Sequence, residues 1–224
     1  GNGGISADAE CVDIKATDKE NMVKFAKENA IDFCVVTPDD PLALGMVDVM
    51  EEAGIPCFGP KANAAIIEAS KAFSKDLMKK YGIPTADYET FDNEKDALHY
   101  IEEKNTFPIV IKADGLALGK GVLICETLDD AKTALREMMV EHVFGLSGNK
   151  VVVEEFMTGK EVSVLAFTDG NVVKPMISSM DHKRAYDNDE GLNTGGMGTI
   201  APSPYYTKEI AETCMETIFL PTVK

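Results

Sequence analysis

The chain has 224 residues, of which 45% are hydrophobic and 27% charged, a composition typical of a folded globular protein. It carries 38 acidic and 22 basic side chains, a formal net charge of −16, and a surface that acidic repels nucleic acid. No apolar run approaches the roughly 20 residues of a bilayer-spanning helix, so we expect binding to neither nucleic acid nor membrane.

The five cysteines are scattered along the chain without paired spacing. Their odd number favours reduced, buried thiols over a disulfide framework, as expected for a cytoplasmic protein. None of the three histidines pairs with a cysteine or another histidine at metal-ligand spacing, so we expect no metal site through them.

The first sixty residues alternate helix and strand patterns. The expected elements are helices over Lys19–Asn29 and Leu42–Ala53 and strands over Ile31–Val36 and Ile55–Phe58. Thr17 or Asp18 can cap the first helix, and Gly54 ends the second. Strand, helix and strand with short loops form a βαβ unit, so residues 1–60 predict a partial Rossmann-like domain with parallel strands.

Residues 61–224 have a different pattern, which predicts an α+β domain with a small lobe over about 86–156. A long helix over Lys61–Tyr81 comes first, with Lys71 in its middle, where most lysines face solvent. The lobe should contain strands over Tyr88–Phe91, Pro108–Asp114, Val122–Cys125 and Val151–Phe156, and helices over Glu94–Lys104 and Asp129–Val140.

The last part of the chain begins with a hairpin and continues as a long polar segment. Thr168-Asp169-Gly170-Asn171 separates two alternating runs, Glu161–Phe167 and Val172–Ile177, which is a strong hairpin signal. From Ser178 to Pro204 the chain is glycine-rich and lacks any period, which is typical of a functional loop or a disordered one. A final helix is expected from near Thr207.

A lysine followed by a glycine-rich turn is the most informative local pattern. A strand ends at Lys112, and Gly115, Gly119, Lys120 and Gly121 follow before the next strand. Glycines let backbone N–H groups approach an anion, and two ammonium groups balance the charge of a polyphosphate. The turn leads into a strand, so it is neither a P-loop nor a dinucleotide fingerprint. The alternative is a glycine hairpin with solvated lysines.

The strand after residue 150 ends in carboxylates and an aromatic ring, Glu154, Glu155 and Phe156. Backbone groups at such an end can face an adenine edge, and the carboxylate of Glu161 can accept hydrogen bonds from a ribose diol. The alternative, favoured for this segment taken alone, is a buried strand that leaves its sheet through an acidic, solvated turn.

Two short polar motifs stand inside the segment 178–204. The candidate ligand-binding residues in these motifs are Asp181, Lys183, Arg184, Asn193, Gly195 and Gly196. Adjacent Lys and Arg can clamp a phosphate, and consecutive glycines can present amides to a small anion. A mobile surface loop explains this composition equally well.

Together these motifs resemble the glycinamide ribonucleotide synthetase (phosphoribosylamine–glycine ligase) family of the ATP-grasp superfamily. The resemblance runs through the whole chain. The motifs that carry it are Ser-Lys-Ala-Phe-Ser-Lys-Asp (70–76), Val-Ile-Lys-Ala-Asp-Gly-Leu-Ala-Leu-Gly-Lys-Gly-Val (110–122), Glu-Glu-Phe-Met-Thr-Gly-Lys-Glu-Val-Ser (154–163), Asp-His-Lys-Arg (181–184) and Asn-Thr-Gly-Gly-Met-Gly (193–198). It implies an ATP-grasp fold, in which two α+β lobes close on the nucleotide, preceded by a Rossmann-like domain.

The resemblance also implies roles for individual residues. Lys71 and Lys112 should contact ATP phosphates from opposite lobes, with the Gly115–Gly121 loop folded over them. The adenine hinge would contain Glu154, Glu155 and Phe156, and Glu161 would hold the ribose. The catalytic residues would be Lys71, Lys112 and Arg184. The substrate pocket would be lined by Asp181, Lys183, Arg184, Asn193, Gly195 and Gly196.

The family's reaction joins glycine to phosphoribosylamine through a glycyl phosphate, using ATP with Mg²⁺ (or Mn²⁺), in purine biosynthesis. The expected partners are therefore small molecules, with no obligate protein partner indicated. The alternatives are another ATP-grasp carboxylate–amine ligase of purine synthesis, or a non-catalytic nucleotide-binding module. Asp-His-Lys-Arg and Asn-Thr-Gly-Gly-Met-Gly argue against the other ligase.

Compared with that family, the chain is expected to be an internal piece of a longer protein. It begins at Gly1 without a methionine and lacks the glycine-rich turn that opens the family's first strand. The segment with the family's magnesium ligands is expected beyond Lys224, so no metal ligand is expected within this chain. The piece alone is therefore expected to be inactive.

Overall fold

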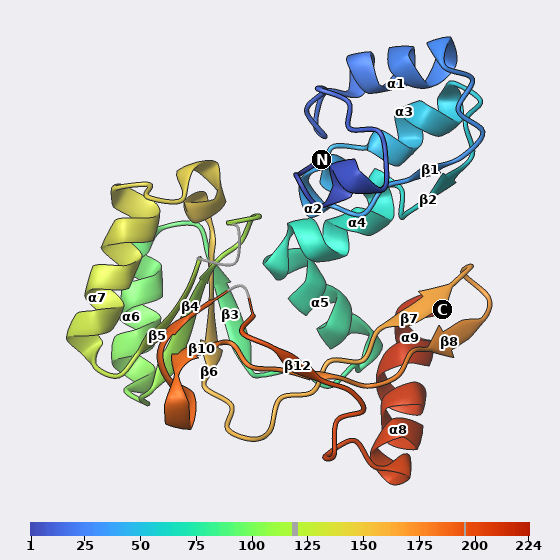
Figure 1. Ribbon diagram of the computed structural model, residues 1–224. Coiled ribbons are helices and arrows are strands. Elements are labelled where there is room, and N and C mark those ends of the chain that lie inside the picture. Colours follow the sequence, from blue (N-terminus) through green and yellow to red (C-terminus); the bar gives the residue numbers. More distant parts are fainter. Residues whose placement is uncertain (118–120, 195) are drawn as a thin grey trace. The chain divides into compact units, whose positions relative to one another are not determined.

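The computed structural model describes residues 1–117, 121–194 and 196–224, and of Asp189, Leu192 and Asn193 it describes the backbone alone (Figure 1). The chain forms two compact units. The first unit contains residues 1–74 and 88–154, and the second contains residues 75–87 and 155–224. In the described ranges, no helix is both long and apolar enough to cross a bilayer.

The first seventy residues form small helices beside a short parallel strand pair. The elements are η1 (Ile5–Ala7), α1 (Lys19–Glu28), β1 (Cys34–Val35), α2 (Asp39–Ala43), α3 (Met46–Glu52), β2 (Cys57–Phe58) and α4 (Ala62–Ala69). β1 and β2 pair in parallel with Cys34 opposite Cys57, as the βαβ pattern predicts. Asp18 caps α1 by accepting a hydrogen bond from the Asn21 amide. A buried cluster that includes Val36, Met46 and Met50 joins α1, α2, α3 and the two strands.

Two helices that were predicted to be continuous are each divided in two by a residue with a non-helical backbone, so both predictions were wrong. The helix predicted over Leu42–Ala53 is interrupted at Gly45, whose φ of 80° is in the left-handed region, between α2 and α3. The helix predicted over Lys61–Tyr81 is interrupted at Ser70, whose φ of −135° and ψ of 113° are extended. Lys71 is therefore the first residue of α5 (Lys71–Tyr81) and not a mid-helix residue.

The rest of the first unit is a four-stranded sheet with helices on one face (Figure 1). Its elements are β3 (Tyr88–Phe91), α6 (Glu94–Lys104), β4 (Ile109–Ala113), β5 (Val122–Cys125), α7 (Leu128–Leu135), the π-helical turn η2 (Arg136–Val140), η3 (Gly145–Asn149) and β6 (Val151–Glu155). The strand order is β3–β6–β4–β5, and β3 pairs with β6 and β4 with β5 in antiparallel register. The expected strands and helices of this lobe are confirmed to within a few residues.

Caps and apolar packing explain why the helices and strands of this lobe lie where the sequence predicts them. Asn93 accepts from the Asp96 amide at the start of α6, and Thr127 forms a capping box with Asp130 at the start of α7. Ile101 of α6 and Leu135 of α7 are fully buried in the core of the sheet. Burial of that extent contributes roughly 1.5–3 kcal/mol for each such side chain.

The second unit contains α5 from Lys75 onward, and residues 155–224 add short strands followed by helical turns. The elements are β7 (Ala166–Thr168), β8 (Val173–Pro175), β9 (Met180–Asp181), β10 (Arg184–Tyr186), η4 (Asp187–Asp189), β11 (Glu190–Asn193), β12 (Thr199–Ile200), α8 (Lys208–Cys214), η5 (Met215–Phe219) and α9 (Leu220–Val223). β7 and β8 form the expected hairpin, although each strand is shorter than predicted. Thr207 caps α8 by accepting from the Ile210 amide.

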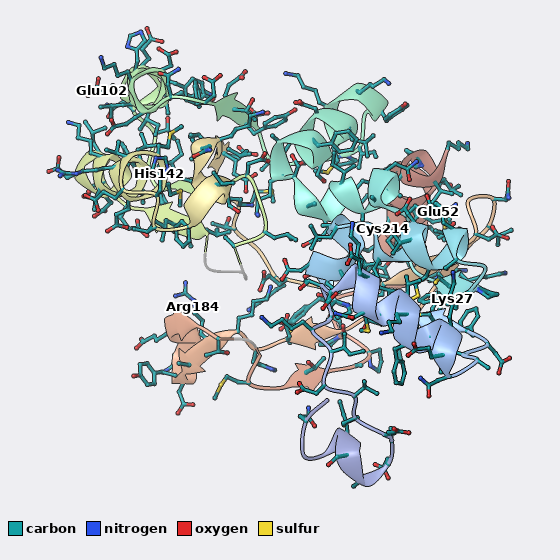
Figure 2. The ribbon with its side chains drawn as sticks, turned by 90° about the horizontal axis from the view of Figure 1, so that it is seen from above. Lys27, Glu52, Glu102, His142, Arg184 and Cys214 are labelled. Carbon is teal, nitrogen blue, oxygen red and sulfur yellow. The ribbon has the colours of Figure 1, made fainter. Side chains whose placement is uncertain are left out.

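The sequence suggested a loop without regular structure over 178–204, and this prediction was wrong for the described part of the segment, which contains paired strands. β9 pairs antiparallel with β12, and β10 with β11. Strands of two to four residues are too short to produce a readable alternation, and their pairing is carried by backbone hydrogen bonds. Figure 2 shows the side chains of both units, and exposed residues such as Lys27, Glu52 and Glu102 project from their helices.

Candidate functional site

The first unit brings Lys71 to the start of the glycine-rich turn. The Lys71 ammonium donates a hydrogen bond to the Gly115 carbonyl at 3.0 Å. Burial lowers the pKa of Lys71, the carboxylates of Glu68 and Asp114 oppose that shift, and the charge of Lys112 adds to it. The ammonium is therefore partly removed from water, and it donates to a neutral carbonyl oxygen.

Lys112 projects from β4 and forms an ion pair with Glu154 on the neighbouring strand β6. The Glu154 residue is 6% exposed, and the Lys112 side chain is 27% exposed. A carboxylate that buried needs a cation close by, so the pair fixes the Lys112 ammonium at the sheet surface. The side chain of Glu154, which the sequence assigned to an adenine hinge, contacts this lysine.

The glycines of the turn are placed where a side chain would not fit. A Cβ on Gly115 would lie 2.5 Å from Ser147 Oγ, and a Cβ on Gly121 would lie 2.7 Å from the Ala117 Cβ. Ser147 also donates to the Leu116 carbonyl at 3.2 Å, so the η3 turn holds the start of the loop. Gly119 and Lys120 lie outside the described residues.

Ser70 and Asp114 also belong to the site around Lys71 and the glycine-rich turn, and the sequence predicted a role for neither. The Asp114 carboxylate accepts hydrogen bonds from Ser70 Oγ at 3.0 Å and from the Ala72 amide at 2.7 Å. A serine inside an otherwise helical pattern is a signal for a cap, because its hydroxyl competes for backbone amides. Nothing in the local sequence around Asp114 indicates a partner more than forty residues earlier in the chain.

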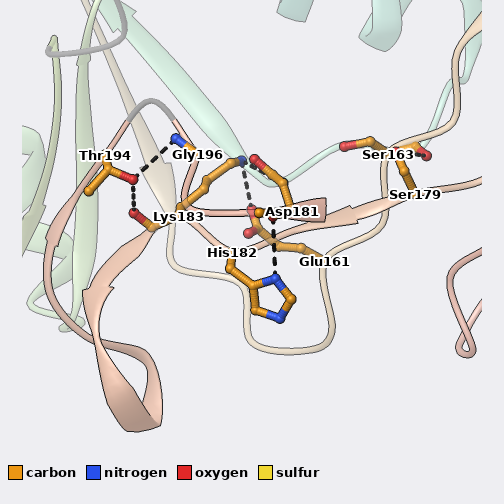
Figure 3. A network of polar contacts seen from close by, with 9 residues as sticks. Glu161, Ser163, Ser179, Asp181, His182, Lys183, Thr194 and Gly196 are labelled. Atoms are coloured by element: carbon orange, nitrogen blue, oxygen red, sulfur yellow. Dashed lines mark hydrogen bonds and ion pairs between the residues drawn. The ribbon is translucent and has the colours of Figure 1, made fainter. Parts of the chain in front are cut away.

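The second unit contains a cavity of about 530 Å³, a size suited to a small ligand. Its lining includes Glu161, Asp181, His182, Arg184, Tyr186 and Tyr205. Lys183 Nζ lies 3.4 Å from Glu161 Oε1 and 4.0 Å from Asp181 Oδ1, and Figure 3 shows the lysine between the two carboxylates. Three expected ligand-binding residues from two segments of the chain thus converge at one place.

The remaining expected residues of the polar segment stand on the β10–β11 hairpin and beyond it. Arg184 Nη1 donates to the Gly191 carbonyl at 2.6 Å, so the guanidinium braces its own hairpin. The backbone of Asn193 pairs with Arg184 across the hairpin. The Gly196 amide donates to Thr194 Oγ1 at 3.1 Å. Gly195 lies outside the described residues.

Glu155 and Phe156 lie at the end of β6 in the second unit. The Glu155 carboxylate accepts from the Asp87 amide at 3.2 Å, and the Glu155 amide donates to the Asp87 carbonyl at 3.0 Å. Phe156 is 38% exposed, which leaves part of its ring available for contact. The expected base-binding residues are thus distributed over both units.

His182 and Tyr205 line the cavity of the second unit, although the sequence suggested neither as a ligand-binding residue. The His182 Nδ1 lies 3.3 Å from the Gly198 carbonyl oxygen, which can only accept, so the proton of a neutral ring is assigned to Nδ1. The Lys160 ammonium lies 5.7 Å from the centre of the Tyr205 ring. A tyrosine in a turn carries no sequence signal for this contact.

The candidate site of the first unit suits a polyphosphate. Lys71, Lys112 and the tightly packed Gly115 and Gly121 match the needs of a polyphosphate, which binds cations and exposed backbone amides. Among the residues that the structure describes, no three His, Cys, Asp or Glu side chains gather closely enough to hold a metal ion.

Comparisons with known proteins match the whole length of this chain. The model of the phosphoribosylglycinamide synthetase N domain matches residues 1–68, and that of the phosphoribosylglycinamide synthetase ATP-grasp (A) domain matches residues 69–224. A phosphoribosylamine–glycine ligase from Clostridium acetobutylicum is 47% identical over 223 residues, which cover 100% of this chain and 53% of that protein. The chain thus spans about half the length of the curated relatives it matches.

Solved structures give the same result for the fold. The crystal structure of the phosphoribosylamine–glycine ligase from Thermotoga maritima superimposes with a TM-score of 0.82 and 30% identity, over 99% of this chain and 52% of that one. The biotin carboxylase domain of 2-oxoglutarate carboxylase from Hydrogenobacter thermophilus, solved with MgADP and bicarbonate, has a TM-score of 0.72 and 20% identity, over 92% of this chain and 45% of that one. The expected fold, a Rossmann-like part followed by an ATP-grasp part, is confirmed.

Proposed function

The chain belongs to the phosphoribosylglycinamide synthetase family, and on that basis we propose that the protein ligates glycine to phosphoribosylamine with cleavage of ATP to ADP and phosphate. The product would be glycinamide ribonucleotide, an intermediate of purine biosynthesis. The observation that carries the proposal is the hydrogen bond from Lys71 to Gly115, which places a half-buried cation at the glycine-rich turn that follows Lys112.

In the proposed reaction, the glycine carboxylate attacks the γ-phosphorus of ATP, and ADP leaves. The amine of phosphoribosylamine then attacks the carbonyl carbon of glycyl phosphate, the bond from that carbon to the phosphate oxygen breaks, and the nitrogen loses a proton. Both steps need alignment of reactants and neutralisation of charge more than a nucleophilic side chain. Lys71 and Lys112, half-buried and held by Gly115 and Glu154, are suited to that task.

The proposed nucleotide site consists of Lys71, Lys112, the Gly115–Gly121 loop, Glu154, Glu155, Phe156 and Glu161. Glu154 would act through Lys112, whose position its carboxylate fixes. For Glu161, the ion pair with Lys183 supports contact with a polar ligand of the second-unit cavity at least as well as contact with a ribose. Bound Mg²⁺ (or Mn²⁺) would neutralise phosphate charge.

The proposed site for glycine and phosphoribosylamine is the cavity of the second unit. It presents Asp181 to an ammonium group and Arg184 to an anionic group, with Lys183 held between two carboxylates beside them. Asn193, Gly195 and Gly196 would complete it. Arg184 is also the proposed catalytic residue of this unit.

We further propose that residues 1–60 are a domain distinct from the ATP-grasp part 61–224, and that about 86–156 forms its lid lobe. The proposed location is the cytoplasm, with small-molecule partners and no obligate protein partner. A closing lid would protect the acyl phosphate from water.

The proposal is tested by assaying the protein at the full length of its relatives for ADP and phosphate release. We expect release only when glycine and phosphoribosylamine are both present. Turnover with another amino acid but not with glycine would point to a different carboxylate–amine ligase and contradict the substrate assignment. If the protein binds ATP but turns it over with no combination of amino acid and amine, the alternative of a non-catalytic nucleotide-binding module would hold.

A further inference from the structure

Asp114 joins three segments of the first unit at one residue. Its amide donates to the Lys150 carbonyl at 3.0 Å, and its own carbonyl accepts from the Lys71 amide at 3.0 Å. Its carboxylate accepts from the Ser70 hydroxyl and the Ala72 amide. Both backbone groups and the side chain are therefore engaged, and they tie β4, the start of α5 and the chain before β6 together.

These bonds close the N-terminus of α5. The Lys71 amide is bound to the Asp114 carbonyl, the Ala72 amide to the Asp114 carboxylate, and the Phe73 amide to Ser70 Oγ at 3.1 Å. The first amides of a helix are a usual place for a phosphate, and here protein oxygen atoms already occupy them. Asp114 thus occupies the position of an anion at this helix end, and a phosphate near it would meet the Lys71 side chain and not the first amides of α5.

The Lys71 side chain is held in a way that allows it to change its acceptor. Its ammonium donates to the Gly115 carbonyl, a neutral oxygen, and a phosphate oxygen is a stronger acceptor for a cation. Gly115 lies close against Ser147, where a Cβ would come within 2.9 Å of the Ser147 Cβ, and its amide donates to the Ser147 carbonyl at 3.5 Å. Both sides of the Lys71–Gly115 contact are therefore held by other segments. Asp114 links the two sides, because it precedes Gly115 in the chain and binds the Lys71 and Ala72 amides.

We propose that Asp114 is a positioning residue for polyphosphate binding, which holds the start of α5 and the start of the glycine-rich loop in fixed register. The Lys71 ammonium can then pass from the Gly115 carbonyl to a phosphate oxygen while both backbones stay in place. This role rests on the proposed nucleotide-binding function. It requires no contact between Asp114 and the ligand, because its hydrogen-bonding groups face protein donors and acceptors.

The test compares Asp114→Ala and Asp114→Asn in the full-length protein, with MgADP titrated by calorimetry and stability followed by thermal unfolding. Asp114→Ala removes both side-chain bonds, and we expect the Kd for MgADP to rise roughly tenfold, as follows from losing a helix cap that also aligns a binding group. Asp114→Asn keeps an oxygen for the Ala72 amide and should restore most of the affinity.

The matched control is Asp18→Ala, because Asp18 caps α1 of the same unit through the Asn21 amide at 3.2 Å. It should lower the Tm as a lost cap does and leave the Kd for MgADP within about twofold of the parent. Equal affinities for Asp114→Ala and the parent would overturn the positioning role, and so would equal losses of affinity in Asp114→Ala and Asp18→Ala. A parent protein that does not bind MgADP would remove the proposed function itself, and the role of Asp114 with it.

Discussion

The two candidate sites hold their charges in different ways. In the first unit, Lys71 and Lys112 are half-buried and contact groups from other elements, Gly115 and Glu154. In the second unit, Glu161 is exposed and Lys183 lies 3.4 Å from it, near a hairpin of very short strands. In the first site the charges are partly removed from water, so loss of one partner should strongly lower the free energy of unfolding. The charges of the second site are solvated, so removing one of them should change the stability of the fold little and should mainly change ligand binding.

Lys112→Ala should have the largest effect, because it acts on a buried carboxylate and on the proposed phosphate site together. Loss of the cation beside Glu154 should lower the free energy of unfolding by roughly 2 to 3 kcal/mol. ATP affinity should fall by about a hundredfold, the effect of losing a desolvated cation, as measured by calorimetry.

The double variant Lys112→Met with Glu154→Gln separates the two effects. It replaces the pair by uncharged side chains of similar size, so stability should largely return while ATP affinity stays low. Recovery of both would assign Lys112 a purely structural role. An unchanged dissociation constant in Lys112→Ala would end its proposed contact with phosphate.

Gly191→Ala tests the hairpin that carries Arg184 and is the next largest change. Gly191 has a φ of 85°, and a Cβ there would lie 2.5 Å from Cδ2 of the Tyr186 ring. Strain and overlap together should cost roughly 2 kcal/mol and open the β10–β11 pairing, detected as faster amide hydrogen exchange over 184–193.

Two glycines of the same unit provide controls for Gly191→Ala. Gly170 has a φ of 88° with no atom near its Cβ position, so Gly170→Ala should cost roughly half as much. Gly198 has open space and no positive φ, so Gly198→Ala should be neutral. Equal exchange rates in Gly191→Ala and Gly198→Ala would show that the hairpin does not depend on this contact.

Lys183→Met should have a smaller effect, confined to ligand binding. The free protein should unfold at nearly the parent temperature, because ion pairs this exposed add little. The KM for phosphoribosylamine should rise several-fold at low salt, and the difference should shrink as salt screens the charges. Lys208→Met, which removes a comparable exposed pair with Glu212 on α8, should leave KM unchanged. A shift of equal size in both variants would mean a general charge effect.

The smallest expected effect concerns the turn of the β7–β8 hairpin. Hydrogen bonds from the Val172 and Asn171 amides lower the pKa of Asp169 below its usual 3.8. A lowered folded-state pKa means that the contribution is complete above pH 3.8 and is lost as the pH falls through the folded value. NMR titration of the carboxyl carbon should show the low pKa, and Asp169→Asn should remove the acid dependence of the turn amides. A midpoint at 3.8 or above would contradict these bonds.

The sequence predicts the elements well where local signals and burial agree. The helices predicted to begin at Glu94, at Asp129 and near Thr207 begin within about one residue of those positions in the structure. The fold class and family followed from motifs that occur in order along the chain. What could not be predicted depends on contacts between distant segments.

The break at Ser70 shows why such contacts are invisible in the sequence. The apolar period runs on through Ser70, and the helix ends there because Ser70 and Asp114, 44 residues apart, bond to each other. The pairing of Lys183 with Glu161 is of the same kind, since no local pattern places these side chains together. Local propensity decides which elements form, and the tertiary partners decide where they stop and what their charges meet.

The most direct test of the account is a crystal structure of the full-length protein with a non-hydrolysable ATP analogue. We expect the β- and γ-phosphates within about 3 Å of the Lys71 and Lys112 ammonium groups, with Lys71 moved off the Gly115 carbonyl and Asp114 still bound to the Ala72 amide. A nucleotide bound elsewhere, or Lys71 still on Gly115 with phosphate out of its reach, would contradict the account.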